Sequence, residues 1–219
     1  TDGDGREVKD YLDHIGYLPQ NFDVFPELTA YEVLQFFANL KGYKITEAEI
    51  DHLLEILNLS PQRDMTVKTL SGGMKRRLGI AQALIGDPDV LLLDEPTAGL
   101  DPEERLNFKN VIRRIKGDRC VVLSTHIITD IESLCDRILV LCDGRITAFD
   151  SCGALADVAR GKVYAVEDTA DLATPFHSMG PVTVDGKACE KIISKAPLNA
   201  PALEPTVEDG YICFIEKLS

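Results

Sequence analysis

The sequence predicts an α/β fold, in which a parallel sheet packs against helices, with a small α+β appendage at the C-terminal end. Three observations indicate this class. Short apolar runs without alternation stand at 90–93, 120–123 and 138–141, as expected of strands that are buried on both faces. A helix start separates the first two runs, and alternating strands and helices are typical of α/β domains. Beyond Ser151 the spacing of apolar and turn residues changes.

Helix signals dominate the segment before the first run. Residues 29–32 and 46–49 have the composition of capping boxes, in which a hydroxyl and a carboxylate each bond a free backbone N–H. Apolar residues recur at helical spacing after both boxes. A third helix is predicted over 74–85, with Gly86 in the C′ position.

The later elements have equally local signals. Residues 101–104 predict a helix start with an acidic N-cap, Pro at N1 and Glu at N3. Asp-Gly pairs at 143–144 and 185–186 predict hairpin turns. A short helix over 153–159 and a strand over 163–166 complete the predicted appendage. The predicted domains are residues 1–150 and residues 151–219.

The composition limits the possible partners. The net charge is -13, from 23 basic and 36 acidic residues, and such a chain repels nucleic acid and anionic membrane surfaces. A local cluster, Lys75-Arg76-Arg77, could still bind one phosphate group. The six cysteines form no CxxC pair, which favours buried, reduced thiols in a cytosolic protein. No apolar run approaches the roughly 20 residues that a membrane span needs, and no signal peptide opens the chain.

The strongest chemical signal is the apolar run that ends in Asp94 and Glu95. Carboxylates at the C-terminal tip of a buried parallel strand lie where α/β folds bind ligands. One of them could hold Mg²⁺ through water while the other orients an attacking water, as phosphoryl transfer requires. A solvated acidic turn accounts for these two residues equally well when they are considered alone.

A second signal precedes the first by 23 residues. Ser71-Gly72-Gly73 stands directly before a predicted helix, where glycines let backbone amides approach an anion and the helix dipole adds attraction. Alone, this tripeptide is more often a flexible loop. Its position relative to Asp94 favours phosphate binding.

Together these motifs resemble a known family. The run from Leu70 to Asp101, LSGGMKRRLGIAQALIGDPDVLLLDEPTAGLD, resembles the signature, Walker B motif and D-loop of ABC ATPases. Residues 16–20 resemble the Q-loop and residues 124–126 the H-loop. The segment that begins at 25–29 resembles the helical subdomain of transporter members. The tail resembles the C-terminal extension of bacterial ABC-2 type transporter ATPases.

The resemblance implies a fold and a set of catalytic residues. The fold is an incomplete P-loop NTPase core with an ABC helical subdomain, and the cofactors are ATP and Mg²⁺. Glu95 is the catalytic carboxylate that polarises water, and His126 contacts the γ-phosphate. Asp94 supports Mg²⁺. Gln20 senses Mg²⁺ and the attacking water, and its loop touches a transmembrane partner.

The resemblance also implies a site that is shared between two subunits. Ser71, Gly72 and Gly73 are expected to bind the γ-phosphate of a nucleotide that the opposite subunit holds. Asp101 belongs to a loop that communicates across this head-to-tail dimer.

One motif of the family is absent from the sequence. The Walker A pattern, GxxxxGKS or GxxxxGKT, occurs nowhere, and the Gly-Lys pairs at 161–162 and 186–187 lack its other residues. In the family this loop precedes the Q-loop, so the resemblance places it before Thr1, with a sheet strand and a helix. The chain alone is therefore expected to bind MgATP very weakly and to show no meaningful ATPase activity.

We expect an ATPase subunit that powers transport through a membrane permease. It would pair with a second ATPase subunit and contact the inner face of a bacterial cell membrane only through the permease, from the cytoplasm. One alternative is a soluble ABC ATPase of translation or DNA repair, which the acidic charge and the lack of a basic stripe disfavour. The other is a non-catalytic fragment that contributes only signature residues, which the presence of Glu95 and His126 disfavours.

Overall fold

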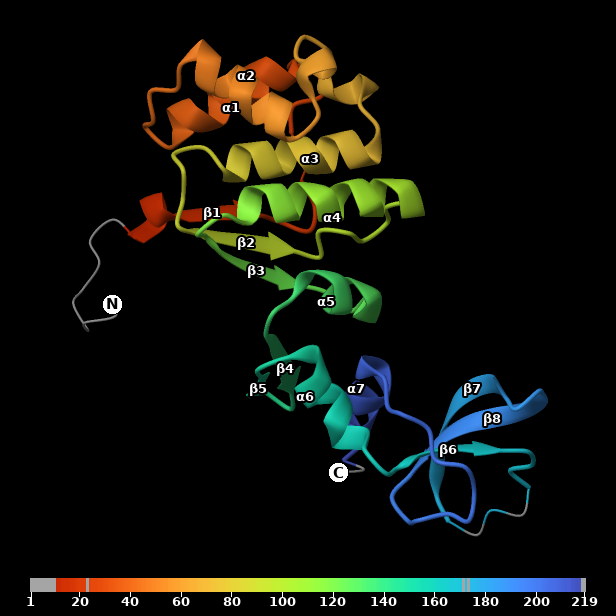
Figure 1. Cartoon of the computed structure of the whole chain (residues 1–219). Helices are drawn as coiled ribbons and strands as arrows, with labels where there is room; N and C mark the ends of the chain where they lie inside the picture. Colours follow the sequence, from red (N-terminus) through yellow and green to blue (C-terminus); the bar gives the residue numbers. More distant parts are fainter. Residues whose placement is uncertain (1–10, 23, 171, 173, 218–219) are drawn as a thin grey trace. The chain divides into compact units, whose positions relative to one another are not determined.

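The computed structural model describes residues 11–217 except 23, 171 and 173, in two compact units that divide between His126 and Ile127 (Figure 1). This division precedes the hairpin over residues 138–149, whereas the predicted domain boundary follows it. Each unit has its own sheet and helices. Among the described residues, no helix is both long and apolar enough to cross a membrane.

A parallel sheet forms the base of the first unit. Its strands are β1 (Ile15–Leu18), β2 (Val90–Asp94) and β3 (Cys120–Ser124), in the order β1-β2-β3. Both pairs are parallel, and the register aligns Leu18 with Leu93 and Leu93 with Leu123. The predicted α/β class with a parallel sheet is confirmed. The four-residue strand β1 was not part of the prediction.

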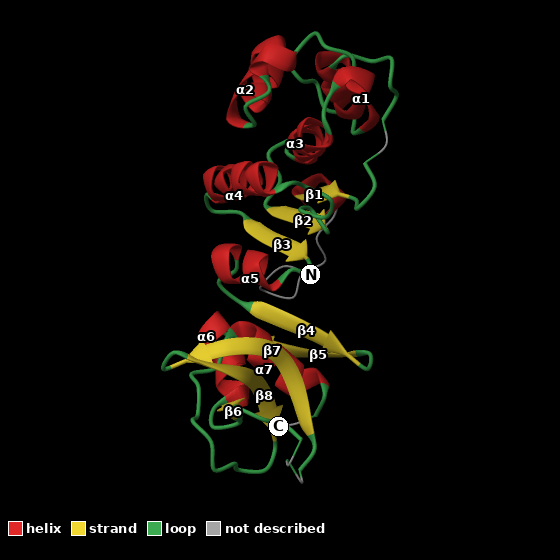
Figure 2. Ribbon diagram, turned by 90° about the vertical axis from the view of Figure 1, so that its right-hand side faces the viewer, coloured by secondary structure: helices red, strands yellow, loops and turns green. Residues whose placement is uncertain are grey.

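Helices cover one face of this sheet in two tiers (Figures 1 and 2). The nearer tier holds α3 (Gly72–Ala83) and α4 (Pro102–Lys116), and the farther tier holds α1 (Ala30–Leu40) and α2 (Glu47–Ile56). No helix among the described residues up to His126 covers the other face, where Tyr17 and Val122 are 51% and 45% exposed. The prediction that these strands are buried on both faces is therefore wrong in this structure.

Side-chain caps set the start of each α-helix in this unit. The capping boxes at 29–32 and 46–49 are both present, and Asp101 caps α4 by accepting the Glu104 N–H at 2.8 Å. Ser71 caps α3 in the same way, through the Met74 N–H at 3.1 Å. The helix therefore begins at Gly72, two residues before its predicted start.

Close backbone approach fixes α3 on the sheet. A Cβ atom at Gly16 of β1 would lie 2.1 Å from the Ala83 carbonyl oxygen, so only glycine permits this contact. The Gln82 side chain donates to the Tyr17 carbonyl at 2.7 Å. Buried Leu78 and Ile80 add roughly 1.5–3 kcal/mol each through the hydrophobic effect. The helix that carries the predicted signature residues is thus held rigidly over β1.

The second unit is α+β. A helix α5 (Ile128–Leu134) precedes the antiparallel hairpin of β4 (Ile138–Cys142) and β5 (Arg145–Phe149), which turns at the predicted Asp-Gly pair. The run at 138–141 is thus not a member of the parallel sheet, and Leu139 and Leu141 of β4 are exposed. This part of the prediction is wrong, because an apolar run alone does not specify its pairing partner.

A second, antiparallel sheet follows in the order β6-β8-β7. Its strands are β6 (Val163–Val166), β7 (Phe176–Val184) and β8 (Lys187–Ser194), and its helices are α6 (Cys152–Ala156) and α7 (Val207–Ile215). The strand over 163–166 and the turn at 185–186 are as predicted. Helix α7 and its capping box at Thr206 and Asp209 were not predicted.

Short 3-10 turns and free thiols complete the described chain. The turns are η1 (Tyr11–His14), η2 (Ser60–Gln62), η3 (Val67–Thr69) and η4 (Asp157–Ala159). All six cysteines are free, as predicted, but Cys213 alone among them is buried and Cys120 is exposed.

Candidate active site

The carboxyl ends of β2 and β3 bring the predicted catalytic residues together. Asp94 ends β2 and lies beside Ser124, its register partner at the end of β3. The Ser124 hydroxyl donates to Asp94 Oδ1 at 2.6 Å and accepts the Glu95 N–H at 2.9 Å. One hydroxyl group therefore fixes both carboxylate residues at the sheet edge.

Glu95 has an unusual backbone conformation. Its φ of 43° lies in the left-handed region, which costs a non-glycine residue about 1–2 kcal/mol. This conformation turns the chain sharply at the strand end and directs the Glu95 side chain toward His126, whose Nδ1 lies 2.9 Å from Glu95 Oε1. An ionised carboxylate only accepts hydrogen bonds, so Nδ1 is the donor in this pair.

The second carboxylate oxygen of Glu95 differs from the first in its hydrogen bonding. Glu95 Oε2 is buried and has no hydrogen-bond partner among the described residues. Leaving such an acceptor unpaired costs about 1–3 kcal/mol, which a bound water or substrate hydroxyl would recover. The Glu95 side chain is 19% exposed and His126 is 73% exposed, so the site opens to solvent on the histidine side. The histidine side is therefore the side from which a ligand could approach this pair.

The chemistry of the site also fits a magnesium ion. No cluster of three or more His, Cys, Asp or Glu side chains that could enclose a metal occurs among the described residues. Mg²⁺ does not need such a cluster, because it usually keeps several waters and binds one or two carboxylates together with phosphate. Asp94, held by Ser124, is the carboxylate that could serve it.

Gln20, the other predicted metal ligand, lies in the loop that follows β1. Its carbonyl oxygen accepts from Arg76 Nη1 of α3 at 2.6 Å, and the same guanidinium bonds the carbonyls of Asp94 and Glu95. The structure thus connects the predicted Q-loop and Walker B residues through one arginine. An open pocket of about 230 Å³ is lined by Gln20, by Gly72 of α3 and by the loop over residues 98–100.

The predicted signature residues lie apart from the Glu95–His126 pair. Ser71 and Gly72 are exposed at the start of α3, where Ser71 Oγ serves as the helix cap. Gly73 is buried, and a Cβ there would collide with the Glu104 side chain of α4. No hydrogen bond among the described residues joins this segment to the pair. Asp101 likewise caps α4 at an exposed position.

Two residues of this site were not identified from the sequence. Ser124 belongs to the H-loop match, and its position opposite Asp94 follows only from the strand register. Arg76 was grouped with Lys75 and Arg77 as a phosphate-binding cluster. That prediction is wrong for both arginines, which are 8% and 7% exposed and bond protein carbonyls.

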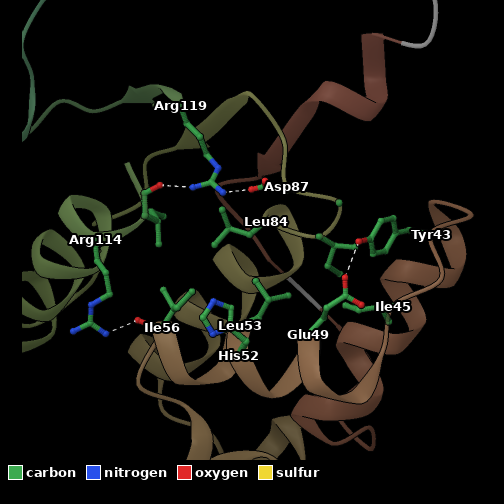
Figure 3. Close-up of a pocket in the computed structure, with 13 residues that line it drawn as sticks. Tyr43, Ile45, Glu49, His52, Leu53, Ile56, Leu84, Asp87, Arg114 and Arg119 are labelled. Carbon is green, nitrogen blue, oxygen red and sulfur yellow. Dashed lines mark hydrogen bonds and ion pairs between the residues drawn. The ribbon is translucent and has the colours of Figure 1, made fainter. Parts of the chain in front are cut away.

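A separate cavity of about 320 Å³ lies at the opposite end of the strands (Figure 3). Its lining includes Asp87, which precedes β2, and Arg119, which precedes β3. Arg119 bonds Asp87 and Arg114 donates to the Ile56 carbonyl at 2.9 Å, so internal contacts already engage both arginines. This cavity is distinct from the candidate active site.

A parallel sheet whose central strand leads into two carboxylates, with a histidine from the next strand end, is consistent with the class of P-loop NTPase-like domains. Comparison with known proteins adds a family match for part of the chain. Residues 1–98 match the family described as ABC transporter. The chain is similar to the uncharacterised ABC transporter ATP-binding protein YhcH of Bacillus subtilis, with 38% identity over 144 residues, which cover 64% of this chain and 47% of that protein.

Mouse proteins are similar as well. The ABC-type organic anion transporter ABCA8B is 40% identical over 167 residues, which cover 74% of this chain and 10% of that protein. The phospholipid-transporting ATPase ABCA3 is 41% identical over 142 residues, which cover 64% of this chain and 8% of that protein. The chain thus spans about half of YhcH and about a tenth of the two mouse proteins. The family match over residues 1–98 and the similarity to ABC transporter ATP-binding proteins support a fragment of an ABC nucleotide-binding domain.

Proposed function

We propose that this chain is part of an ATPase subunit that powers transport through a membrane permease, and that Glu95 and His126 carry the hydrolytic step. The observation that supports this most is the buried, unpaired Glu95 Oε2 beside His126. In the proposed reaction, Oε2 accepts a hydrogen bond from the attacking water and orients it. Positioning of this kind, together with charge stabilisation, accounts for most of the catalysis of phosphoryl transfer.

His126 would stabilise the charge that develops on the transferred phosphoryl group. Its Nδ1 donates to Glu95, so Nε2 can donate to a phosphate oxygen only when the ring carries both protons. Asp94, and the side chain of Gln20, would hold Mg²⁺ through water. The bound ion would supply neutralisation of the phosphate charge.

Substitution of Glu95 by Gln in the full-length gene product tests this role. The amide keeps the size of the side chain and loses its negative charge, so ATP hydrolysis should fall by at least about 100-fold. ATP should remain bound and hold the subunits together, as gel filtration with MgATP would show. Glu103→Gln, which removes an exposed carboxylate from the first turn of α4, is the control. Unchanged hydrolysis in Glu95→Gln would reject the assignment.

The nucleotide site would be completed by a second subunit. Exposed Ser71 and Gly72 stand at the N-terminus of α3 without a bond to the Glu95–His126 pair, so they are free to meet a nucleotide that another copy holds. Helix N-termini favour bound phosphate. The 219 residues contain no Walker A pattern, and we infer that this chain alone neither binds MgATP tightly nor hydrolyses it. Tight binding of MgATP to the isolated chain in calorimetry would contradict this.

The permease contact would lie beside the Q-loop. Phe25 and Phe36 form an edge-to-face pair with ring centroids 5.4 Å apart, and both rings and Leu40 are exposed. Exposed aromatic residues of this kind are enriched in protein interfaces. Phe25→Ser with Phe36→Ser should release the subunit from a co-purifying membrane protein, while Leu106→Ser, at an exposed leucine of α4, should not. Co-purification with ribosomes or DNA instead would reject the transport role.

A further inference from the structure

Arg76 makes an extensive set of hydrogen bonds to the protein main chain. It is 8% exposed, in the second turn of α3, and its guanidinium has five N–H donors. Every donor bonds a main-chain carbonyl. Nε bonds Pro96 at 2.9 Å, Nη1 bonds Pro19 at 3.1 Å and Gln20 at 2.6 Å, and Nη2 bonds Asp94 at 3.1 Å and also Glu95.

Four of these carbonyls belong to the two loops that leave the sheet at its carboxyl edge, and the fifth is that of Asp94, the last residue of β2. One loop follows β1 and carries Gln20, and the other follows β2 and carries Glu95. Beyond the last strand residue a carbonyl loses its ladder partner, and a buried carbonyl needs a replacement. Arg76 provides this replacement for both loops at once and anchors them to α3.

The main-chain bonds also fix the Glu95 side chain. The main-chain N–H of Glu95 donates to Ser124, and its main-chain carbonyl accepts from Arg76. Its side-chain Oε1 contacts His126. The remaining polar atom, Oε2, is the one that we propose orients water. A shift of the Arg76 guanidinium would allow the Glu95 backbone to leave its left-handed conformation, and the orientation of Glu95 Oε2 would then no longer be fixed.

We infer that Arg76 is a positioning residue: through their main-chain carbonyls it fixes the loops of Gln20 and Glu95 relative to each other, so that neither loop moves without the other. The inference rests on the proposed function for its catalytic consequence. The bonds from Arg76 to the two loops are not salt bridges, because their acceptors are main-chain carbonyl groups. Burial lowers the pKa of the Arg76 guanidinium, and the nearby carboxylates of Asp94 and Glu95 oppose that effect.

The neighbouring Arg77 provides a matched control. It is equally buried, at 7% exposure, and lies on the same helix. Its Nη1 group is directed at the carbonyls of Leu57 and Asn58 and its Nη2 group at the Glu104 side chain, away from both loops. Lysine has three donors and a single nitrogen, so Arg76→Lys leaves at least two of the five carbonyls unpaired.

Hydrogen–deuterium exchange of the full-length gene product tests the inference without ATP hydrolysis. In Arg76→Lys, peptides that cover 19–22 and 95–98 should both exchange about tenfold faster, whereas Arg77→Lys should leave them unchanged. Faster exchange in only one of the loops, or an equal increase in both variants, would overturn the inference. Because this readout needs no hydrolysis, it stands even if Glu95→Gln shows that the proposed function is wrong.

Kinetics then test the catalytic consequence. Arg76→Lys should lower kcat by about 10- to 100-fold with KM for ATP changed by less than about threefold, because the loops orient water more than they bind nucleotide. An unchanged kcat, or an effect confined to KM, would overturn it. If the variant does not fold, native-state exchange of the wild-type protein in low urea decides: the two loops should open with one urea dependence, and independent opening would refute the coupling.

Discussion

The contact between Gly16 and Ala83 allows a quantitative test of how α3 is held on the sheet. In Gly16→Ala the new Cβ would lie 2.1 Å from the Ala83 carbonyl oxygen and 2.9 Å from its carbonyl carbon. Ordinary contact begins near 3.4 Å, so the C-terminal end of α3 must retreat by about 1.3 Å. The obstacle is backbone, and no side-chain rotation removes it.

The cost follows from what this retreat disrupts. Overpacking of a core costs about 1–3 kcal/mol, and loss of the hydrogen bond from Gln82 to the Tyr17 carbonyl adds about 1 kcal/mol. We therefore expect Gly16→Ala to lower the free energy of unfolding by about 3 kcal/mol, out of the roughly 5–15 kcal/mol of a typical domain. Urea denaturation should show the midpoint lowered by about 1–3 M.

A second glycine serves as the control for this experiment. A Cβ at Gly72 has nothing within 4 Å, and helix formation favours alanine over glycine by up to about 1 kcal/mol. Gly72→Ala should therefore leave the unfolding free energy unchanged or raise it slightly. A loss below about 1 kcal/mol in Gly16→Ala would show that α3 can slide on β1, and the rigid attachment of Arg76 would then be refuted.

Three further substitutions have expected outcomes. Ser124→Ala removes the hydroxyl that joins the two carboxylate residues, and should lower kcat of the full-length gene product by about 10- to 100-fold with little change in nucleotide affinity, measured by steady-state kinetics and by calorimetry; an unchanged kcat would contradict this. Lys191→Met leaves Asp209, which is completely buried, without its ion-pair partner at 2.7 Å, and should cost about 3–5 kcal/mol in thermal or urea unfolding of the second unit; a cost below 1 kcal/mol would show that the pair is dispensable. Thr46→Ala removes the hydroxyl whose hydrogen bond lowers the pKa of Glu49 from its ordinary value of 4.5. A depressed pKa stabilises the fold above that value, and the stabilisation is lost as the pH falls through the folded pKa. The melting temperatures of the two proteins should therefore differ most near pH 7 and least near pH 3, and a difference independent of pH would refute this.

Local signals in the sequence predict the helix caps and hairpin turns well. The capping boxes at 29–32 and 46–49 involve residues three positions apart, so their hydrogen bonds depend on few other parts of the chain. The Asp-Gly turns at 143–144 and 185–186 are local in the same sense, because both residues of each pair have positive φ. The capping box of α7 has the same pattern with Asp209 in place of Glu, and a search that allowed Asp would have found it.

Features that depend on distant contacts could not be predicted. Arg76 and Arg77 are adjacent, of one residue type and equally buried, yet one bonds the site loops and the other bonds residues 57–58. Nothing in the local sequence distinguishes them, because the acceptors of Arg76 lie 18 to 57 positions away. Likewise, the apolar run at 138–141 does not indicate whether its partner is a parallel strand or the antiparallel β5.

Strand register connects the motifs to the geometry of the site. Once Val90 of β2 pairs with Cys120 of β3 in parallel, the register places Asp94 opposite Ser124 at the end of both strands. A slip of one residue would put Leu123 or Thr125 opposite Asp94 and turn the alternate face of β3 toward the helices. The Ser124 hydroxyl would then no longer face Asp94, and His126 could not keep its 2.9 Å contact with Glu95. The spacing of carboxylates, serine and histidine in the sequence is therefore meaningful only in this register, which the packing of the apolar strand residues selects.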